Sequence, residues 1–463
     1  MNGVTTATPT IFIIFGITGD LAGRKLLPAL LNLYVKKQLP SKFAIVGFSR
    51  KPFNREDFRV FVREHMNIRP GQYREEEVKH FIDHMYYEQG NFDASSSYAQ
   101  LAQRLKNIDD GFHQCSNKLF HLSIPPSLYE SIFQHLSNSG LTIPCGGDEG
   151  WTRILVEKPF GNDSEMAKKL DKKLGELFDE NQVFRIDHYL AKEALQNILA
   201  FRFSNSLFEP LWNRKYVDKV HIKLLEKIGV EGRGAFYDGI GALKDVGQNH
   251  MLQMLALIAM EPPAATDAAT IRSERAKVLN RLQPITSKNI ASRVVRGQYE
   301  GYKFEGGVKE YTQTETYFRI ESYINNPRWK NVPFYLESGK SLADTKTEID
   351  IYFKNEKNEE RQNVLTFRIQ PDEGIKIRFW VKTPGFTMDV EPKLLKFKYS
   401  DSASLSVLPD AYEKVLHDAI IGDQTLFTST EEVASAWKYV TSVLSSWNVV
   451  PLTIYRKGTQ DVL

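Results

Sequence analysis

Short, mostly apolar segments recur in the first third of the chain, separated by longer segments with helical spacing. The runs lie at residues 11–16, 43–48, 118–124 and 153–157. Runs of this length are typical of strands buried on both faces of a parallel sheet. Helices are predicted between them, at 22–38 and around 58–66. Strands that alternate with helices predict a Rossmann-like, doubly wound parallel sheet of the α/β class.

The second half of the chain shows a different pattern. A strand is expected at 219–225, then a helix over about 248–259, and then a surface loop at 262–270. Alternating apolar and polar positions follow at 318–323, 348–353, 364–369, 375–381 and 394–399. With few helices expected between them, these segments predict an α+β domain with a large, mainly antiparallel sheet. We therefore expect two domains, residues 1–185 and 186–463.

Composition narrows the class of protein. A chain of 463 residues is too long for one ordinary core, which agrees with two domains. Lys and Arg total 60 against 57 Asp and Glu, and this balance argues against a nucleic-acid partner. The longest apolar stretch, 251–260, is about half the roughly 20 residues that cross a bilayer. Residues 1–10 do not resemble a signal peptide, so no membrane partner is expected.

The two cysteines, Cys115 and Cys145, form neither a disulfide framework nor a metal-ligand pattern. This usage suits a reducing, cytoplasmic setting, and no metal is expected.

The turn after the first predicted strand is a candidate dinucleotide site. Small residues at Gly16, Gly19 and Ala22 would let the chain turn tightly and bring backbone N–H groups to a pyrophosphate at the helix N-terminus. An ordinary strand-to-helix turn is the alternative. The second strand ends at Ser49 and Arg50 without the acidic residue that NAD binders place on the ribose.

Because that acid is missing, the pattern favours NADP, with NAD possible. Arg50 could hold a 2′-phosphate, Ser49 could donate to it and Lys25 could add charge. A solvated surface role for Arg50 is the alternative.

Two polar clusters follow later strands of the first domain. In the segment EKPFG at 157–161, Lys158 stands where ligands of an open parallel sheet bind, although it could be a surface lysine. In RIDHYLAKE at 185–193, His188 and Lys192 are four residues apart and would share one face of a helix. With the Tyr189 hydroxyl they suit a phosphate dianion. The alternative is a helix start capped by Asp187.

Two further clusters lie in the second domain. Asp245 and His250 would be about 140° apart on an ideal α-helix and would not share a face. They could still pair if Asp245 lies just before the helix and His250 lies in its first turn. A histidine backed by a carboxylate suits proton abstraction, and a helix-start histidine with Asp245 as cap is the alternative. In EKIGVEGRG at 226–234, Glu226 could accept a sugar hydroxyl. Glu231 and Arg233 are expected to form a structural ion pair.

In this order, the blocks resemble the glucose-6-phosphate dehydrogenase family from residue 11 to about 455. The segment 185–193 is close to the family signature, and 157–161, 231–234 and 245–253 look like further family blocks. The resemblance implies an oxidoreductase of glucose and carbohydrate metabolism. Such an enzyme passes hydride from C1 of D-glucose 6-phosphate to NADP and yields 6-phospho-D-glucono-1,5-lactone, the first step of the oxidative pentose phosphate pathway.

The resemblance also implies roles for individual residues. His250 is the expected general base, and Asp245 is its carboxylate partner and a substrate contact. The other expected substrate contacts are Lys158, His188, Tyr189, Lys192, Glu226, Lys340 and Gln370. The expected cofactor contacts are Gly16, Thr18, Gly19, Asp20, Leu21, Lys25, Arg50, Pro125 and Lys158.

The sequence departs from the family pattern at three places. Ala191 replaces a glycine, which would cost nothing in a helix. Thr345 stands where many members carry a basic residue, with Lys346 one step further, and the tail 456–463 lacks a Gly-Pro pair. The tail is not expected to carry chemistry.

Two other functions are compatible with the motifs: another NAD(P)-dependent sugar oxidoreductase, or a silent relative that binds a metabolite. The large open sheet predicts a homodimer or homotetramer.

Overall fold

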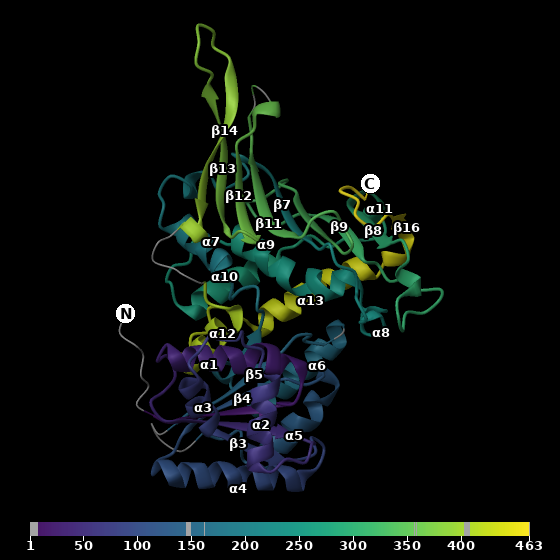
Figure 1. Ribbon diagram of the computed structural model, residues 1–463. Helices are drawn as coiled ribbons and strands as arrows, with labels where there is room; N and C mark the ends of the chain where they lie inside the picture. Colours follow the sequence, from purple (N-terminus) through teal and green to yellow (C-terminus); the bar gives the residue numbers. More distant parts are fainter. Residues whose placement is uncertain are drawn as a thin grey trace. The chain divides into compact units, whose positions relative to one another are not determined.

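The computed structural model describes residues 8–144, 150–161, 163–355, 357, 359–401 and 408–462, so Cys145 lies outside the described residues. The chain folds as two compact units (Figure 1). Unit 1 comprises Met1–Gly161, Glu165–Ala191 and Pro409–Thr430, and unit 2 comprises Asn162–Ser164, Lys192–Leu408 and Glu431–Leu463. The sequence pattern carries no signal for the return of the chain to unit 1 at residue 409.

Unit 1 is built on a seven-stranded sheet in the order β15-β6-β5-β4-β1-β2-β3. Its strands are β1 (Thr10–Phe15), β2 (Phe43–Ser49), β3 (Met85–Gln89), β4 (Asn117–Leu122), β5 (Thr152–Val156), β6 (Val183–Ile186) and β15 (Phe427–Thr428). All pairs are parallel except β15 with β6. The strands β1, β2 and β4 are buried along their whole length, as is typical of a parallel sheet covered on both faces. The predicted parallel sheet is confirmed.

Helices cover both faces of this sheet, with α1 and α4 on opposite sides (Figure 1). The longer helices are α1 (Leu27–Val35), α2 (Arg55–His65), α3 (Glu75–Asp83), α4 (Ser95–Phe112), α5 (Tyr129–Asn138), α6 (Ser164–Leu177) and α12 (Ala411–Ile421). The predicted helix 22–38 is shorter than expected, because the π-helical turn η1 (Ala22–Leu26) precedes α1.

Polar contacts explain why α12 belongs to unit 1. Asn32 and Lys36 of α1 bond the Glu413 carboxylate at 2.5 and 3.0 Å. At the other end of α12, the Arg153 guanidinium donates to the carbonyls of Ala419 and Ile420, each at 2.7 Å. These bonds satisfy helix-end groups that have no partner within the helix.

Unit 2 is built on a nine-stranded sheet in the order β14-β13-β12-β11-β7-β10-β9-β8-β16. Its strands are β7 (Val217–Leu225), β8 (Val294–Tyr299), β9 (Tyr317–Ser322), β10 (Phe334–Gly339), β11 (Lys346–Phe353), β12 (Val364–Gln370), β13 (Gly374–Lys382), β14 (Val390–Lys398) and β16 (Leu452–Tyr455). Only β7 with β10 and β8 with β16 pair in parallel within the described residues. The expected mainly antiparallel sheet is therefore confirmed.

More helices lie in unit 2 than the sequence pattern predicts. They are α7 (Glu193–Phe203), α8 (Gly234–Tyr237), the π-helix η5 (Leu243–Met251), α9 (Leu252–Ala259), α10 (Ala268–Asn280), α11 (Ile290–Arg293) and α13 (Thr430–Leu444). The loop expected at 262–270 ends early, because Asp267 caps α10. The helix η5 lies beside β7 and β10 and continues directly into the fully buried α9.

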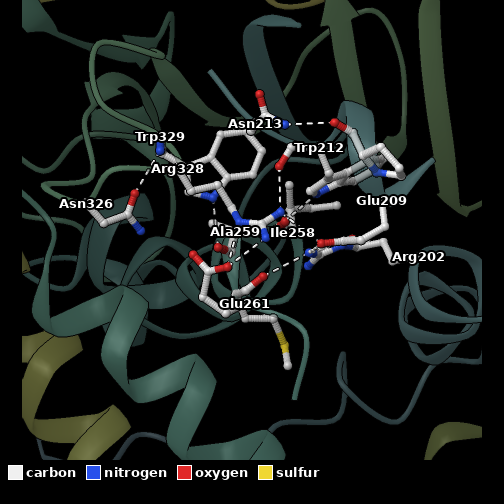
Figure 2. Close-up of polar contacts among 12 residues, drawn as sticks. Arg202, Glu209, Trp212, Asn213, Ile258, Ala259, Glu261, Asn326, Arg328 and Trp329 are labelled. Atoms are coloured by element: carbon white, nitrogen blue, oxygen red, sulfur yellow. Dashed lines mark hydrogen bonds and ion pairs between the residues drawn. The ribbon is translucent and has the colours of Figure 1, made fainter. Parts of the chain in front are cut away.

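Side chains hold the last carbonyls of α9, as Figure 2 shows. The fully buried Arg202 donates to the carbonyls of Leu257 at 3.0 Å and Met260 at 2.9 Å. The indoles of Trp212 and Trp329 donate to the next two carbonyls, those of Ile258 and Ala259, at 2.7 and 2.8 Å. Because a helix end buried without such donors is costly, these bonds fix the position of the η5–α9 rod at its C-terminal end.

Candidate active site

The turn after β1 is tight and leads directly into the first helix of the chain. Gly16 adopts a left-handed φ of 76°, and a Cβ there would overlap the carbonyl of Ser123. Its N–H donates to the Phe48 carbonyl at 2.9 Å, and the Gly19 N–H closes the turn onto Gly16 at 2.9 Å. The helix begins at Asp20 and Leu21, directly after the turn. Glycine at position 16 thus permits the close approach of Ser123, and the turn leads into a helix N-terminus, where backbone N–H groups favour an anion.

The end of β2 presents one cation to solvent. Arg50 is exposed, and within the described residues its guanidinium forms no hydrogen bond or ion pair. Ser49 differs from the expectation: its hydroxyl is buried, accepts from Thr18 at 3.3 Å and bonds the Tyr87 hydroxyl at 2.9 Å. Lys25 is exposed and pairs with Asp410 at 2.9 Å. Arg50 is therefore the better placed of the two expected cations to meet a phosphate.

The remaining expected residues of unit 1 also follow strand ends. Pro125 comes three residues after β4 and precedes a short 3-10 helix, and Lys158 is the second residue after β5. Next to Lys158, the buried Glu157 accepts at its side chain from Tyr412 and at its carbonyl from Tyr129, both at 3.1 Å. Because β1, β2, β4 and β5 are parallel neighbours, the expected cofactor residues lie along one edge of the sheet.

The segment 188–192 is a turn, so the prediction that His188 and Lys192 share a helix face is wrong. Lys192 is instead the N-cap residue of α7, and Ala191 lies in the turn, where its helix propensity has no effect. Asp187 is buried, and its Oδ1 accepts from the Tyr189 N–H at 3.0 Å. This bond closes the turn that presents His188, whose ring stacks with that of Tyr412.

Lys192 and Gln370 meet in unit 2. The Lys192 ammonium donates to the Gln370 side-chain oxygen at 2.6 Å. Neither Thr345 nor Lys346 joins them by a described contact. Thr345 accepts from the Lys227 N–H at 2.9 Å, and the Lys346 ammonium lies 3.5 Å from the Glu348 carboxylate. The charge that many family members carry at 345 is therefore replaced by a neutral loop contact.

Glu226 and Lys340 form an ion pair at 2.5 Å. They end neighbouring parallel strands, β7 and β10, and Lys340 is buried, with its ammonium 5.5 Å from the centre of the Tyr237 ring. The ion pair expected between Glu231 and Arg233 is wrong, because both side chains are exposed and no such pair exists among the described residues. The turn is shaped instead by left-handed backbone at Glu231, whose φ is 41°.

The C-terminal segment contacts this site, which the sequence pattern did not indicate. The Tyr455 hydroxyl of β16 donates to the Lys340 carbonyl at 2.7 Å. Further on, the Gly458 N–H donates to Ser341 at 2.8 Å and Thr459 accepts from Ala343 at 2.9 Å. The tail therefore supports the loop that carries Lys340.

Asp245 and His250 both lie in η5, which resolves their five-residue spacing. A π-helix bonds residue i to residue i+5, so residues five apart lie on successive turns along the same side. The 140° separation calculated for an ideal α-helix therefore does not apply to this pair. Asp245 lies inside the helix and not just before it. His250 is buried, its N–H donates to the Asn249 side chain at 2.6 Å, and Asn249 donates to the Asp245 carbonyl at 3.0 Å.

Two negative findings complete the site. Across the part of the chain that the structure describes, no helix is long and apolar enough to cross a membrane. The same residues contain no group of three or more His, Cys, Asp or Glu side chains that could hold a metal ion.

Comparisons with known proteins agree over most of the chain. Residues 13–197 match the family described as "Glucose-6-phosphate dehydrogenase, NAD binding domain", and residues 199–462 match "Glucose-6-phosphate dehydrogenase, C-terminal domain". The chain is 44% identical to the glucose-6-phosphate 1-dehydrogenase of Aggregatibacter actinomycetemcomitans over 94% of its length and 90% of that protein. It is 37% identical to the Bacillus subtilis enzyme of the same name, over 94% of this chain and 91% of that protein.

Solved structures show the same likeness. A glucose-6-phosphate dehydrogenase in complex with its substrate glucose 6-phosphate matches with a TM-score of 0.91 and 33% identity, over 98% of this chain and 96% of that chain. The glucose-6-phosphate 1-dehydrogenase of Mycobacterium avium matches with a TM-score of 0.83 and 29% identity, over 97% and 95%.

Proposed function

The chain belongs to the glucose-6-phosphate dehydrogenase family, and we propose that it oxidises D-glucose 6-phosphate at C1 to 6-phospho-D-glucono-1,5-lactone with NADP as the hydride acceptor. One observation carries the proposal beyond family membership. A π-helix holds a buried histidine and an aspartate five residues apart, in the unit that also contains the Lys192–Gln370 and Glu226–Lys340 pairs. A base and several groups suited to a phosphorylated sugar therefore occur together.

The residues of unit 1 fit a dinucleotide with a 2′-phosphate. The tight turn at Gly16 and the helix start at Asp20 suit the pyrophosphate. The exposed Arg50 suits the 2′-phosphate, since a guanidinium binds phosphate with two parallel hydrogen bonds. The NADP nicotinamide, when bound, accepts the hydride from C1. The cofactor would be held by Gly16, Thr18, Gly19, Asp20, Leu21, Arg50, Pro125 and Lys158. Lys25 would contribute less, because its ammonium already pairs with Asp410.

The sugar phosphate would be held by His188, Tyr189 and Lys192, which offer an imidazole, a hydroxyl and an ammonium as donors. Gln370 orients the Lys192 ammonium. Glu226 and Lys340 would bind sugar hydroxyls: the carboxylate accepts and the ammonium donates. Because each partner satisfies the other in the free protein, sugar hydroxyls would exchange with an existing ion pair and would not have to neutralise an isolated buried charge.

His250 would take the proton from the C1 hydroxyl as the hydride leaves. General-base help of this kind is worth about 10²–10⁴ in rate. Asp245, on the same side of η5, would fix the imidazole tautomer and stabilise the imidazolium.

A glucose-6-phosphate dehydrogenase should prefer glucose 6-phosphate over free glucose. This preference distinguishes the proposed function from that of an oxidoreductase that acts on another sugar. The test measures cofactor reduction with glucose 6-phosphate and with free glucose at equal concentrations. We expect kcat/KM to be higher for glucose 6-phosphate by about 10²-fold or more, since free glucose cannot form the charge-assisted bonds of the phosphate site. Equal values for the two sugars would reject the phosphate-specific function. Absence of turnover with both would favour a silent, metabolite-binding relative.

We also propose that the protein forms a homodimer or homotetramer. The edge of the nine-stranded sheet is a hairpin of β13 and β14 whose tip projects beyond the other strands of the sheet (Figure 1). Phe386, Met388, Leu394, Leu395 and Phe397 of this hairpin are exposed. Such an apolar edge is unusual for a monomer. Light scattering should give a multiple of the 53.1 kDa chain mass, and Leu395→Lys should lower it. A monomeric wild type would reject the proposal.

We place this reaction in the cytoplasm. The sugar phosphate and NADP are charged metabolites that do not cross a bilayer unaided. Activity found in the membrane or external fraction of its cells would contradict this location.

A further inference from the structure

The segment 314–316, which precedes β9, forms hydrogen bonds with the start of η5, the helix that carries Asp245 and His250. The Glu315 carbonyl accepts from the Ala242 N–H at 3.1 Å, and its side-chain Oε1 accepts from the Leu243 N–H at 3.0 Å. The other carboxylate oxygen accepts from the Trp447 indole at 3.4 Å. One residue therefore satisfies two of the N–H groups that every helix leaves unpaired at its first turn.

The Glu315 carboxylate is buried and forms no ion pair with a described residue. The charged or titratable groups that face it are Arg296 of β8, Tyr237 of α8 and Tyr302 of the following turn. Burial raises the pKa of Glu315 to about 7, although the Leu243 N–H, the Trp447 indole and the distant Arg296 oppose the increase. A carboxyl group in such a place costs stability when ionised, so packing alone does not account for it.

Two glycines allow the start of η5 to approach the segment that carries Glu315. Gly241 adopts a left-handed φ of 73°, and a Cβ there would overlap the Glu315 carboxylate. Gly247 lies within η5, where a Cβ would come within 2.9 Å of the Phe318 ring of β9. The start of η5 therefore lies close against the segment that carries Glu315.

The same segment also touches the sugar-binding loop. The Thr316 carbonyl accepts from the Lys340 N–H at 3.0 Å, and the Thr314 hydroxyl accepts from the Gly239 N–H at 2.8 Å. The far end of the η5–α9 rod is already fixed by Arg202, Trp212 and Trp329 (Figure 2). Residues 314–316 thus connect the near end of this rod to the loop that carries Lys340.

We propose that Glu315 is a positioning residue, which fixes the first turn of η5 through Leu243 and thereby sets the orientation of His250 relative to Lys340. The inference rests on the proposed function for its kinetic readout. Its structural readout, the protection of backbone amides in η5, does not depend on any activity.

The main test compares Glu315→Gln with wild type. An amide oxygen can still accept from Leu243, but its NH₂ group then faces the Trp447 N–H, so one bond is lost. We expect kcat to fall by about 10- to 100-fold, as for a misplaced catalytic group, with KM for both substrates changed by less than about twofold. Hydrogen exchange should become faster in residues 243–251. Unchanged kcat and unchanged exchange in a folded variant would overturn the proposal.

If Glu315→Gln folds poorly, two other variants disturb the same contact and can be tested in its place. Gly241→Ala should displace the carboxylate and reproduce the kcat loss, and Trp447→Phe should give a smaller loss in the same direction. The matched control is Glu432→Gln, which removes another buried carboxylate of unit 2, bonded to Arg275 at 2.7 Å. It should lower thermal stability and leave kcat and exchange in η5 unchanged. If it lowers kcat equally, Glu315 has only a structural role.

Failure of the proposed function looks different. In that case wild type does not turn over glucose 6-phosphate, yet Glu315→Gln still has faster hydrogen exchange in η5 than wild type. This result would support the positioning role of Glu315 and reject only the assigned reaction.

Discussion

The Lys192 ammonium donates a 2.6 Å hydrogen bond to the side-chain oxygen of Gln370, a residue 178 positions later in the chain. Lys192 begins α7 and Gln370 ends β12. Because an amide oxygen carries no net charge, this bond orients the ammonium without neutralising it. An oriented cation is what a phosphate site requires.

Removing the ammonium should therefore weaken substrate binding more than chemistry. We expect Lys192→Ala to raise KM for glucose 6-phosphate by about 10- to 100-fold, since hydrogen bonds to charged groups contribute about 1.5–3 kcal/mol. Gln370→Ala should raise this KM less, because the variant loses the bond that orients the Lys192 ammonium but keeps the ammonium itself. Steady-state kinetics with both variants measures this, and an unchanged KM in Lys192→Ala would argue against the phosphate role.

His250 should matter for turnover and little for affinity. We expect His250→Ala to lower kcat by about 10²–10⁴, with a similar KM, and Asp245→Asn to lower it by a smaller factor. Near-normal turnover in His250→Ala would reject its role as base. The comparison variant is Asp187→Asn, which alters a buried carboxylate in the segment 185–193. If it lowers kcat and Asp245→Asn does not, the partner of His250 is Asp187.

Arg50 should determine the choice of nicotinamide cofactor. We expect Arg50→Ala to raise KM for NADP by about tenfold or more, since only NADP has the 2′-phosphate, and to leave KM for NAD nearly unchanged. Lys25→Ala provides the comparison, and its effect should be smaller because Asp410 already pairs with that ammonium. Equal effects of Arg50→Ala on both cofactors would place the arginine outside the 2′-phosphate site.

The stability of the protein should depend on pH through Glu315. Burial raises its folded pKa from 4.5 to about 7, so between these values the native state holds a proton that the unfolded state releases. The free energy of unfolding must then fall as pH rises through this window and level off above it. A shift of this size corresponds to about 3 kcal/mol. Glu315→Gln lacks this dependence, so its Tm relative to wild type should rise from pH 4.5 to 7, as thermal melts across pH would show. A constant Tm difference would contradict it.

The sequence pattern located the parallel sheet and the candidate site because the two are physically linked. Buried parallel strands need unbroken apolar runs, as in β1 and β2, and ligands bind where such strands end. Gly16, Arg50 and Lys158 could therefore be chosen from their positions directly after apolar runs. Glu226 and Lys340 were assigned from family resemblance, and the structure adds that they form an ion pair.

Other features depend on contacts that a local pattern does not contain. The return of α12 to unit 1 relies on Glu413 meeting Asn32 and Lys36, nearly 400 residues away. The turn at 188–192 is set by the Asp187 bond to Tyr189, which overrides a helical spacing. The spacing of apolar residues does not indicate that η5 is a π-helix. The sequence alone therefore could not place Asp245 and His250 on the same side of one helix.

The most direct measurement of the central claim uses glucose 6-phosphate that carries deuterium at C1. Incubated with the protein and NADP, it should yield reduced NADP with deuterium in its nicotinamide ring and the phosphorylated lactone, and His250→Ala should abolish most of this transfer. Reduced cofactor without deuterium, or no reduction by a folded wild-type protein, would contradict hydride transfer from C1.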